Sequence, residues 1–435
     1  MSESSKPGVF ARLFKTTSKI EPREFSTVIA AFFLLFFIMG SYFAARPVRE
    51  TIGTLLGRET VAGLWLYTAL FSIIIIPVYG ALVAKVRRSV LLPWIYGFVA
   101  IAFAVMAFYL RADEKNLTVG AIFYVWISVL NLMLISVFWS FLLEVLTTEQ
   151  TKRLFGFIAA GGTAGALAGP LVTRLVVGSV GNSGIMMVGA GGFVCAIVCQ
   201  RILISQWRRQ EAAGVNAAAA TGGAKSEKGL GGNPFAGISI VLKSPYLLGI
   251  ALFVVLLSAA NTFLYFEQIR IVQETFPDTT RRTEVFANMD FVVQSLTVIT
   301  QLFLTGYLAS RLGVKALLTI VPIVMVAGFV LLAFANSFAI LAVVYTVRRW
   351  GEYAFIRPGR EMLFSPLSTE TKYKAKSFID VPVYRGADYV GAQAQTAIDT
   401  LHAGPMVAAF VAAVLAAAWA VNGYLLGRKH DAAAK

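Results

Sequence analysis

The chain has 435 residues, of which 57% are apolar and only 14% are charged, and its mean hydropathy is +0.73. Soluble domains carry about 25% charged residues, so this composition excludes a soluble globular protein. The net charge of +15 fits the excess of Lys and Arg in cytoplasmic loops of membrane proteins, which gives no reason to expect nucleic acid as a partner.

Twelve apolar runs, each long enough to cross a hydrocarbon core about 30 Å thick, follow one another along the chain. They lie at 25–46, 60–84, 89–110, 118–146, 154–178, 184–205, 245–268, 284–310, 314–336, 337–363, 376–401 and 405–427. The long polar stretch between the sixth and seventh runs is rich in Ala and Gly, which is typical of a flexible linker. We therefore predict an all-α membrane protein with twelve transmembrane helices in two six-helix halves.

The predicted segments are an N-terminal segment (1–24), a first half (25–205), a linker (206–244), a second half (245–427) and a tail (428–435). Placing both termini and the linker on one side gives that side most of the 38 Lys and Arg residues. We therefore expect an integral protein of a bacterial inner membrane with both termini in the cytoplasm.

Four glycines of the fifth run, Gly161, Gly162, Gly165 and Gly169, lie near one face of a helix. No strand precedes them and no Gly-Lys-Ser/Thr follows, so a phosphate-binding loop is not indicated. Small residues at this spacing let a second helix approach closely, and we predict a helix-packing face.

Two short segments, Gly80 to Lys85 and Gly306 to Arg311, occupy equivalent places between the second and third spans of the two halves. They resemble the cytoplasmic signature of the major facilitator superfamily, Gly-x-Leu-Ala-Asp-Arg-x-Gly, although both copies lack its Asp. The resemblance implies a fold of the major facilitator type and a gating role for five residues: Gly80, Lys85, Arg88, Gly306 and Arg311. Anchoring of helix ends by basic residues is the alternative explanation for the cations among them.

Ionisable side chains inside membrane spans are costly, so they usually face a water-filled cavity or one another. The cations deep within the spans are all Arg, and together with Arg46 and Arg49 they outnumber the nearby acids. The planar fork of Arg suits bidentate contact with phosphate or carboxylate oxygens, so an anionic substrate is predicted. The alternative is that these groups form internal ion pairs that hold the two halves together.

Three segments carry a more specific resemblance: Arg46 to Thr51, Phe138 to Glu144, and Tyr353 to Val381. They are similar to segments of the nucleotide exchange transporters of plastids and intracellular bacteria, the ATP/ADP translocase group, which is a branch of the major facilitator fold. The resemblance implies alternating-access exchange of nucleotides or a related phosphorylated anion, with charged residues of spans one, four, ten and eleven at the site. Arg49 and Arg360 stand where that group usually has Lys.

The predicted substrate-binding residues are Arg46, Arg49, Glu50, Glu144, Arg174, Arg349, Glu352, Arg357, Arg360, Arg385 and Asp388. We expect a secondary transporter of a small organic anion rather than an enzyme, with no cofactor and no metal site. The expected partners are the substrate and membrane lipids, and we expect a monomer. A lipid translocase and a non-transporting membrane sensor with the same fold are the alternative functions.

Overall fold

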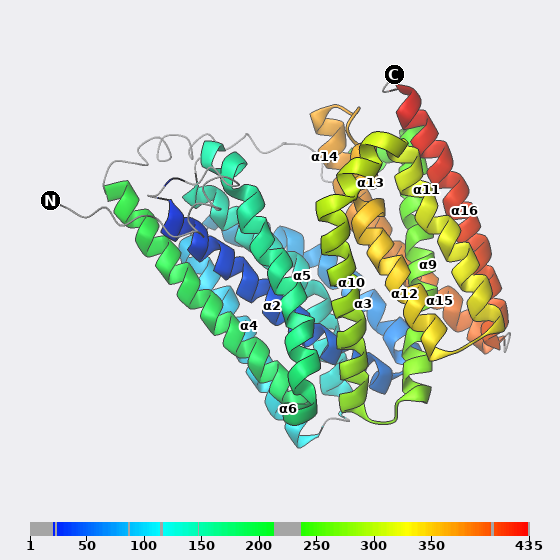
Figure 1. The fold of residues 1–435 in the computed structure, drawn as a ribbon, viewed down its shortest axis with the longest axis horizontal. Coiled ribbons are helices and arrows are strands. Elements are labelled where there is room, and N and C mark those ends of the chain that lie inside the picture. Colours follow the sequence, from blue (N-terminus) through cyan, green and yellow to red (C-terminus); the bar gives the residue numbers. More distant parts are fainter. Residues whose placement is uncertain are drawn as a thin grey trace. The chain divides into compact units, whose positions relative to one another are not determined.

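The computed structural model describes residues 21, 24–85, 88–113, 116–146, 148–212, 236–401 and 404–433. The regular elements within these ranges are helical, and nine of the helices are long and apolar enough to cross a membrane (Figure 1). The all-α membrane class predicted from the composition is therefore confirmed. The segments 1–20 and 213–235, which contain most of the predicted N-terminal segment and linker, lie outside the described residues.

Five helices form the N-terminal half: α2 (Phe25–Leu56), α3 (Arg58–Lys85), α4 (Arg88–Ala112), α5 (Leu117–Val145) and α6 (Thr148–Ala212). The first of these, α2, continues through Pro47 to Leu56 as one helix. The longest, α6, contains both the fifth and the sixth predicted span. The two spans meet at Gly181, whose φ of 68° is left-handed and favours glycine because it has no Cβ.

The C-terminal half contains α8 (Ala236–Lys243), α9 (Pro245–Thr275), α10 (Thr279–Phe303), α11 (Thr305–Phe334), α12 (Phe338–Gly351), α13 (Arg357–Leu363), α14 (Thr369–Phe378), α15 (Tyr384–Thr400) and α16 (Gly404–Ala433). Two π-helical turns, η1 (Glu352–Ile356) and η2 (Ile379–Val383), join α12 to α13 and α14 to α15. These joined pieces cover the tenth and eleventh predicted spans. The helices are therefore consistent with twelve spans.

The chain forms two compact units that do not follow its halves. The first unit contains Met1–Arg46, Val78–Glu114 and Leu130–Gly229. The second contains Pro47–Pro77, Lys115–Val129 and Leu230–Lys435. The end of α2, most of α3 and the start of α5 thus pack with the C-terminal helices.

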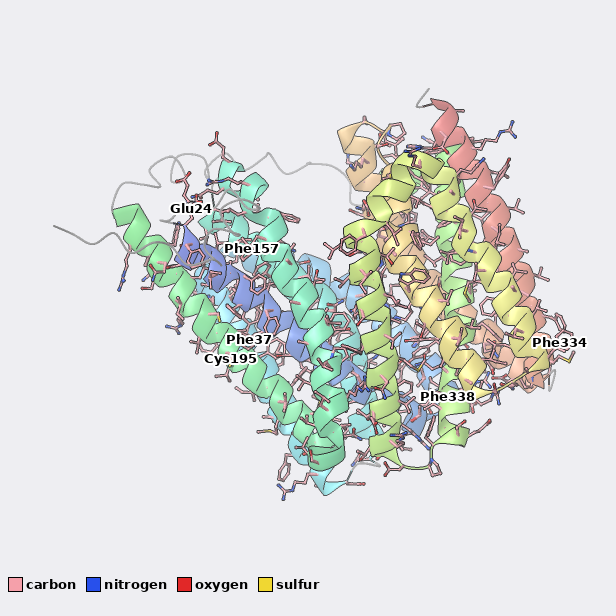
Figure 2. The ribbon with its side chains drawn as sticks, viewed as in Figure 1. Glu24, Phe37, Phe157, Cys195, Phe334 and Phe338 are labelled. Carbon is pink, nitrogen blue, oxygen red and sulfur yellow. The ribbon has the colours of Figure 1, made fainter. Side chains whose placement is uncertain are left out.

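In the first unit, α6 lies against α2 through the predicted glycine face. A methyl group at Gly161 would overlap the carbonyl oxygen of Phe32, and one at Gly165 would overlap that of Phe36. About two helical turns beyond Gly165, Thr173 Oγ1 donates a hydrogen bond to the carbonyl of Ala44 at 2.9 Å. The labelled Phe157 of α6 extends this contact (Figure 2), because its ring lies 5.2 Å from that of Phe32. The glycine face is therefore confirmed as a helix-packing surface.

The core of the second unit lies where α9, α11 and α16 pack together. Its largest fully buried side chains include Trp419, Phe253 and Phe329. The ring of Phe253 meets that of Trp419 at 5.7 Å, and Phe263 meets Phe329 edge-on at 5.2 Å. This apolar packing gives α12 to α15, which carry the candidate site, a fixed support.

Candidate substrate-binding site

The two π-helical turns lie where charged residues and prolines occur together in spans ten and eleven. Pro358 is the second residue after η1, and Pro382 lies within η2. A proline has no N–H to donate, and its ring crowds the carbonyl four residues earlier, so a regular α-helix cannot continue unchanged there. A π turn changes the register of the side chains that follow it, and such turns occur frequently at functional sites.

Arg349 is the most deeply buried cation of the group, with 3% of its side chain exposed. Its guanidinium pairs with the carboxylate of Asp290 on α10. It also donates to the hydroxyls of Tyr345 at 3.0 Å and Tyr353 at 3.1 Å. These three partners saturate much of the donor fork, so Arg349 is held as part of the protein interior.

Glu352, the first residue of η1, accepts hydrogen bonds from two arginines. Arg348 donates to Oε2 at 3.0 Å, and Arg357 donates to Oε1 from Nε at 3.2 Å and from Nη2 at 3.1 Å. Arg357 also lies over the ring of Tyr353, 4.4 Å from its centroid, in a cation–π contact. Yet 54% of the Arg357 side chain is exposed, in contrast to its buried neighbours.

Arg360 and Arg385 have looser partners. Arg360 Nη2 lies 3.2 Å from Asp380 Oδ1 without forming a hydrogen bond, and its buried Nε has no hydrogen-bond partner among the described residues. Arg385 lies 3.6 Å from Asp388, whose carboxylate instead accepts a hydrogen bond from Ser258 of α9 at 2.5 Å. Both arginines therefore retain donor capacity.

These groups form one electrostatic cluster across spans ten and eleven. Arg348 and Glu352 lie within electrostatic range of Asp388, and Arg357 lies within range of Asp380. We call the cluster the arginine site. Its members are Arg348, Glu352, Arg357, Arg360, Asp380, Arg385 and Asp388, so four cations face three carboxylates.

Arg49 and Glu50 form a separate polar group near the end of α2. They pair at 3.0 Å, and Glu50 also accepts a hydrogen bond from the Tyr265 hydroxyl at 2.9 Å. Tyr265 bonds to the Tyr124 hydroxyl at 2.6 Å, and the Arg49 guanidinium lies 4.5 Å from the centre of the Tyr124 ring. Trp65 Nε1 donates to the same Tyr124 hydroxyl at 3.1 Å.

Further contacts tie the ends of α2 and α3 to the C-terminal helices. Thr51 and Thr283 share a hydrogen bond of 2.6 Å, and Arg282 donates to Thr54 at 2.9 Å. Arg58, at the start of α3, pairs with Asp399 of α15 at 2.9 Å. All of these contacts lie within the second unit.

For the remaining predicted residues, the structure gives the exposure of three side chains. Arg174 is exposed on α6, Arg311 is exposed on α11, and Arg46 is partly buried on α2. The side chains predicted at Glu144, Gly80, Lys85, Arg88 and Gly306 lie outside the described residues. From the cost of isolated buried charges, we predict that Arg49, Arg349, Arg360 and Arg385 share one cavity.

Sequence reasoning missed several partners that the structure brings in. Asp290 could have been identified from the sequence, because an acid within the apolar run 284–310 is expected to pair with a buried cation. The sequence does not distinguish three tyrosines, Tyr124, Tyr265 and Tyr353. Tyrosines are common in membrane spans, and their pairing depends on the tertiary fold.

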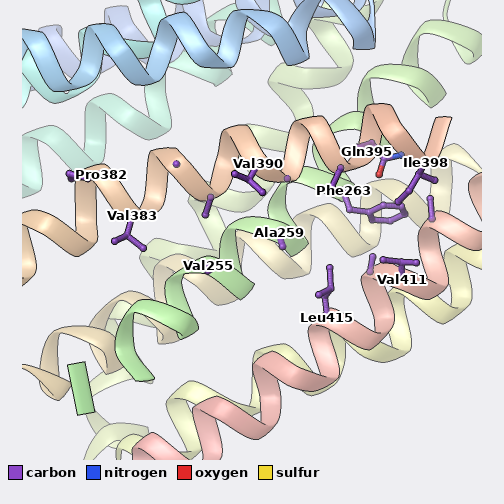
Figure 3. Close-up of a pocket in the computed structure, with 16 residues that line it drawn as sticks. Val255, Ala259, Phe263, Pro382, Val383, Val390, Gln395, Ile398, Val411 and Leu415 are labelled. Carbon is purple, nitrogen blue, oxygen red and sulfur yellow. The ribbon is translucent and has the colours of Figure 1, made fainter. Parts of the chain in front are cut away.

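A cavity of about 400 Å³ lies between α9, α15 and α16 (Figure 3). Its lining is almost wholly apolar, with side chains such as Val255, Phe263, Val390 and Leu415, and Gln395 is its polar member. It lacks the charged donors that recognition of an anion requires, so the arginine site is the better candidate.

Comparison with solved structures gives the fold. The nucleoside transporter NupG matches 93% of this chain and 99% of its own, with a TM-score of 0.62 and 13% identity. The chain has the major facilitator fold. Two further structures share this major facilitator fold. A bacterial homologue of the human lysosomal transporter Spinster, inward-facing and unoccupied, matches 94% of this chain and 98% of its own, with a TM-score of 0.55 and 12% identity. A bacterial metal transporter matches 92% of this chain and 98% of its own, with a TM-score of 0.57 and 14% identity.

No protein-family model and no curated protein matches the sequence. The matches to these transporter structures confirm the major facilitator fold class that was predicted from the sequence. Among the residues that the structure describes, no group of three or more His, Cys, Asp or Glu side chains could hold a metal ion.

Proposed function

We propose that this chain is a secondary transporter that moves a phosphorylated organic anion by alternating access, with the arginine site as its binding site. The observation that carries the proposal is the exposure of Arg357. A charged side chain in a membrane span is costly against lipid, so an arginine with 54% of its side chain exposed is expected to face an aqueous path.

Three arginines of the site have donors to offer. Arg357 directs Nε and Nη2 to Glu352, which leaves Nη1 for another acceptor. Arg360 has an unpartnered Nε, and Arg385 is only loosely paired. A phosphate group carries several strong acceptor oxygens and fits such planar donor forks bidentately. A neutral solute would leave the donors desolvated without compensation.

The charge balance favours exchange as the mode of transport. Four cations face three carboxylates, and an uncompensated charge is expensive when a site closes and loses its water. The empty carrier, with one cation left uncompensated, is therefore expected to change conformation slowly, whereas a bound anion supplies the missing negative charge. Nucleotides are the particular anions suggested by the resemblance of spans one, four and ten to the nucleotide exchange transporters.

Uptake into proteoliposomes tests the proposal. The purified protein is supplied with labelled nucleotides, sugar phosphates and dicarboxylates, with and without internal counter-substrate. We expect uptake of at least one phosphorylated anion and strong stimulation by the counter-substrate. Arg357→Gln should raise the apparent KM about 10-fold to 100-fold, because a hydrogen bond to a charged group contributes about 1.5 to 3 kcal/mol.

Arg281→Gln is the matched control. Arg281 pairs with Glu284 at the exposed start of α10, so its loss should leave the KM unchanged. Transport of only neutral or cationic solutes would overturn the proposal. Anion uptake without counter-substrate would remove only the exchange mode, and substrate binding without uptake would indicate a sensor.

A further inference from the structure

A groove of about 1080 Å³ runs between α4 and α6 in the first unit, and its lining includes no residue of the arginine site. One wall is a stripe of α4 with Trp94, Phe98 and Ile101, and the facing wall is the last part of α6. The three apolar side chains are 75%, 61% and 66% exposed. Large exposed apolar side chains that line a concave surface mark a binding site for an apolar ligand.

The α6 wall of the groove differs chemically from the α4 wall. It carries Arg201, Arg208 and Arg209, and all three are exposed. Within the described part of the chain, no carboxylate pairs with any of them. Arg201 and Arg208 are two helical turns apart, which places both on the face of α6 that also carries Ile197 and Ile204. On the α6 wall, Arg201 lies between Ile197 and Ile204, and Arg208 and Arg209 follow Ile204, so cationic side chains are interspersed with apolar ones.

We propose that this groove binds an anionic phospholipid, with one acyl chain along α4 and the phosphate at the three arginines. The groove joins an apolar α4 wall to an α6 wall with three arginines, which complements the tail and the head of such a lipid. Basic pockets between transmembrane helices on the cytoplasmic side bind anionic head groups, and the arginines lie at the predicted cytoplasmic end of α6. Trp94 adds an amphipathic ring of the kind enriched near head groups.

Native mass spectrometry of the full chain, purified in detergent, tests the site with dioleoyl phosphatidylglycerol and dioleoyl phosphatidylcholine. We expect at least tenfold tighter binding of the phosphatidylglycerol. The triple variant Arg201→Gln, Arg208→Gln, Arg209→Gln should weaken it about a hundredfold, because each basic group near an anionic head group contributes about fivefold.

The matched control removes the same number of exposed cations from the same predicted side of the membrane but from outside the groove. These are Lys243, Arg428 and Lys429, each replaced by Gln. We expect this control to bind phosphatidylglycerol with the same affinity as the wild type. Equal losses in both triple variants, or equal binding of the two lipids by the wild type, would overturn it. Competition by glycerol 3-phosphate alone would also overturn it, since the site would then be one for soluble anions.

Tryptophan quenching gives a second readout that does not require the triple variant to fold. Vesicles contain a small fraction of phosphatidylglycerol or phosphatidylcholine with dibrominated acyl chains, and the difference between wild type and Trp94→Phe isolates the Trp94 signal. Stronger quenching by the brominated phosphatidylglycerol is expected. Equal quenching by both lipids, or no quenching of Trp94, would show that another group occupies the groove.

Discussion

Separating the buried pair of Arg349 and Asp290 should destabilise the protein far more than replacing the pair. Arg349 is 3% exposed and the Asp290 side chain 4% exposed, so neither charge is well hydrated in the folded state. Removing one partner of a buried ion pair costs about 3 to 5 kcal/mol, because the other charge remains buried without compensation. Asp290→Leu and Arg349→Met should each have an effect of this size.

The double variant should behave differently. Apolar side chains in place of both charges leave no unpaired ion, and such replacements are often neutral or even stabilising. The hydroxyls of Tyr345 and Tyr353 would lose a donor but are weak acceptors compared with a carboxylate. We therefore expect the double variant to be at least about 3 kcal/mol more stable than the sum of the single effects implies.

The free energy of unfolding would be measured by titration with dodecyl sulfate in mixed micelles, with helical circular dichroism as the signal. The exposed pair Arg281–Glu284 provides the control cycle, for which a coupling below about 1 kcal/mol is expected. Additivity of the two buried substitutions within about 0.5 kcal/mol would refute the reasoning, because independent sites show additivity of that quality.

Three other substitutions give separable results. Gly165→Ala should lower the free energy of unfolding by about 1 to 3 kcal/mol, because the added methyl group clashes with α2. Gly178→Ala on the same helix has open space and should leave the free energy of unfolding unchanged. Equal effects of the two substitutions would contradict the close approach of α6 to α2. Arg58→Gln should change stability by less than about 1 kcal/mol because its pair with α15 is partly exposed, and a loss above about 2 kcal/mol would count against this view. Arg360→Lys keeps the charge but loses the fork, so substrate affinity in uptake assays should fall while membrane insertion stays normal; unchanged affinity would argue against bidentate contact.

The apolar runs predicted the helices well, because a backbone in lipid must satisfy its hydrogen bonds internally and each span needs a minimum apolar length. The glycine face of α6 was equally predictable, since the spacing of Gly161 and Gly165 defines a helix surface without knowledge of the partner. The locations of these features follow from local sequence alone.

Pairings between side chains of different helices could not be predicted from the local sequence. Arg349 and Glu352 are three residues apart in the sequence, but Arg349 bonds to Asp290 of α10, and Glu352 bonds to Arg348 and Arg357. The π turn after Gly351 changes the register on which an i, i+3 or i, i+4 argument depends. Such pairings depend on tertiary packing, which one sequence does not reveal.

The composition of the second unit has a consequence for how the protein is made. The ends of α2 and α3 emerge early in synthesis, but their partners Thr283 and Asp399 lie 232 and 341 residues downstream of Thr51 and Arg58. Contacts between residues so far apart in the sequence form late, because closing a long loop costs conformational entropy before the contact contributes any stability. In a nascent chain, Thr51 and Thr54 therefore lack these partners until residues 282 and 283 have been made, and Arg58 lacks its partner until residue 399 of the 435 has been made. Membrane proteases that recognise incompletely folded chains would recognise these unpaired groups. A chain truncated before α15 should therefore be degraded.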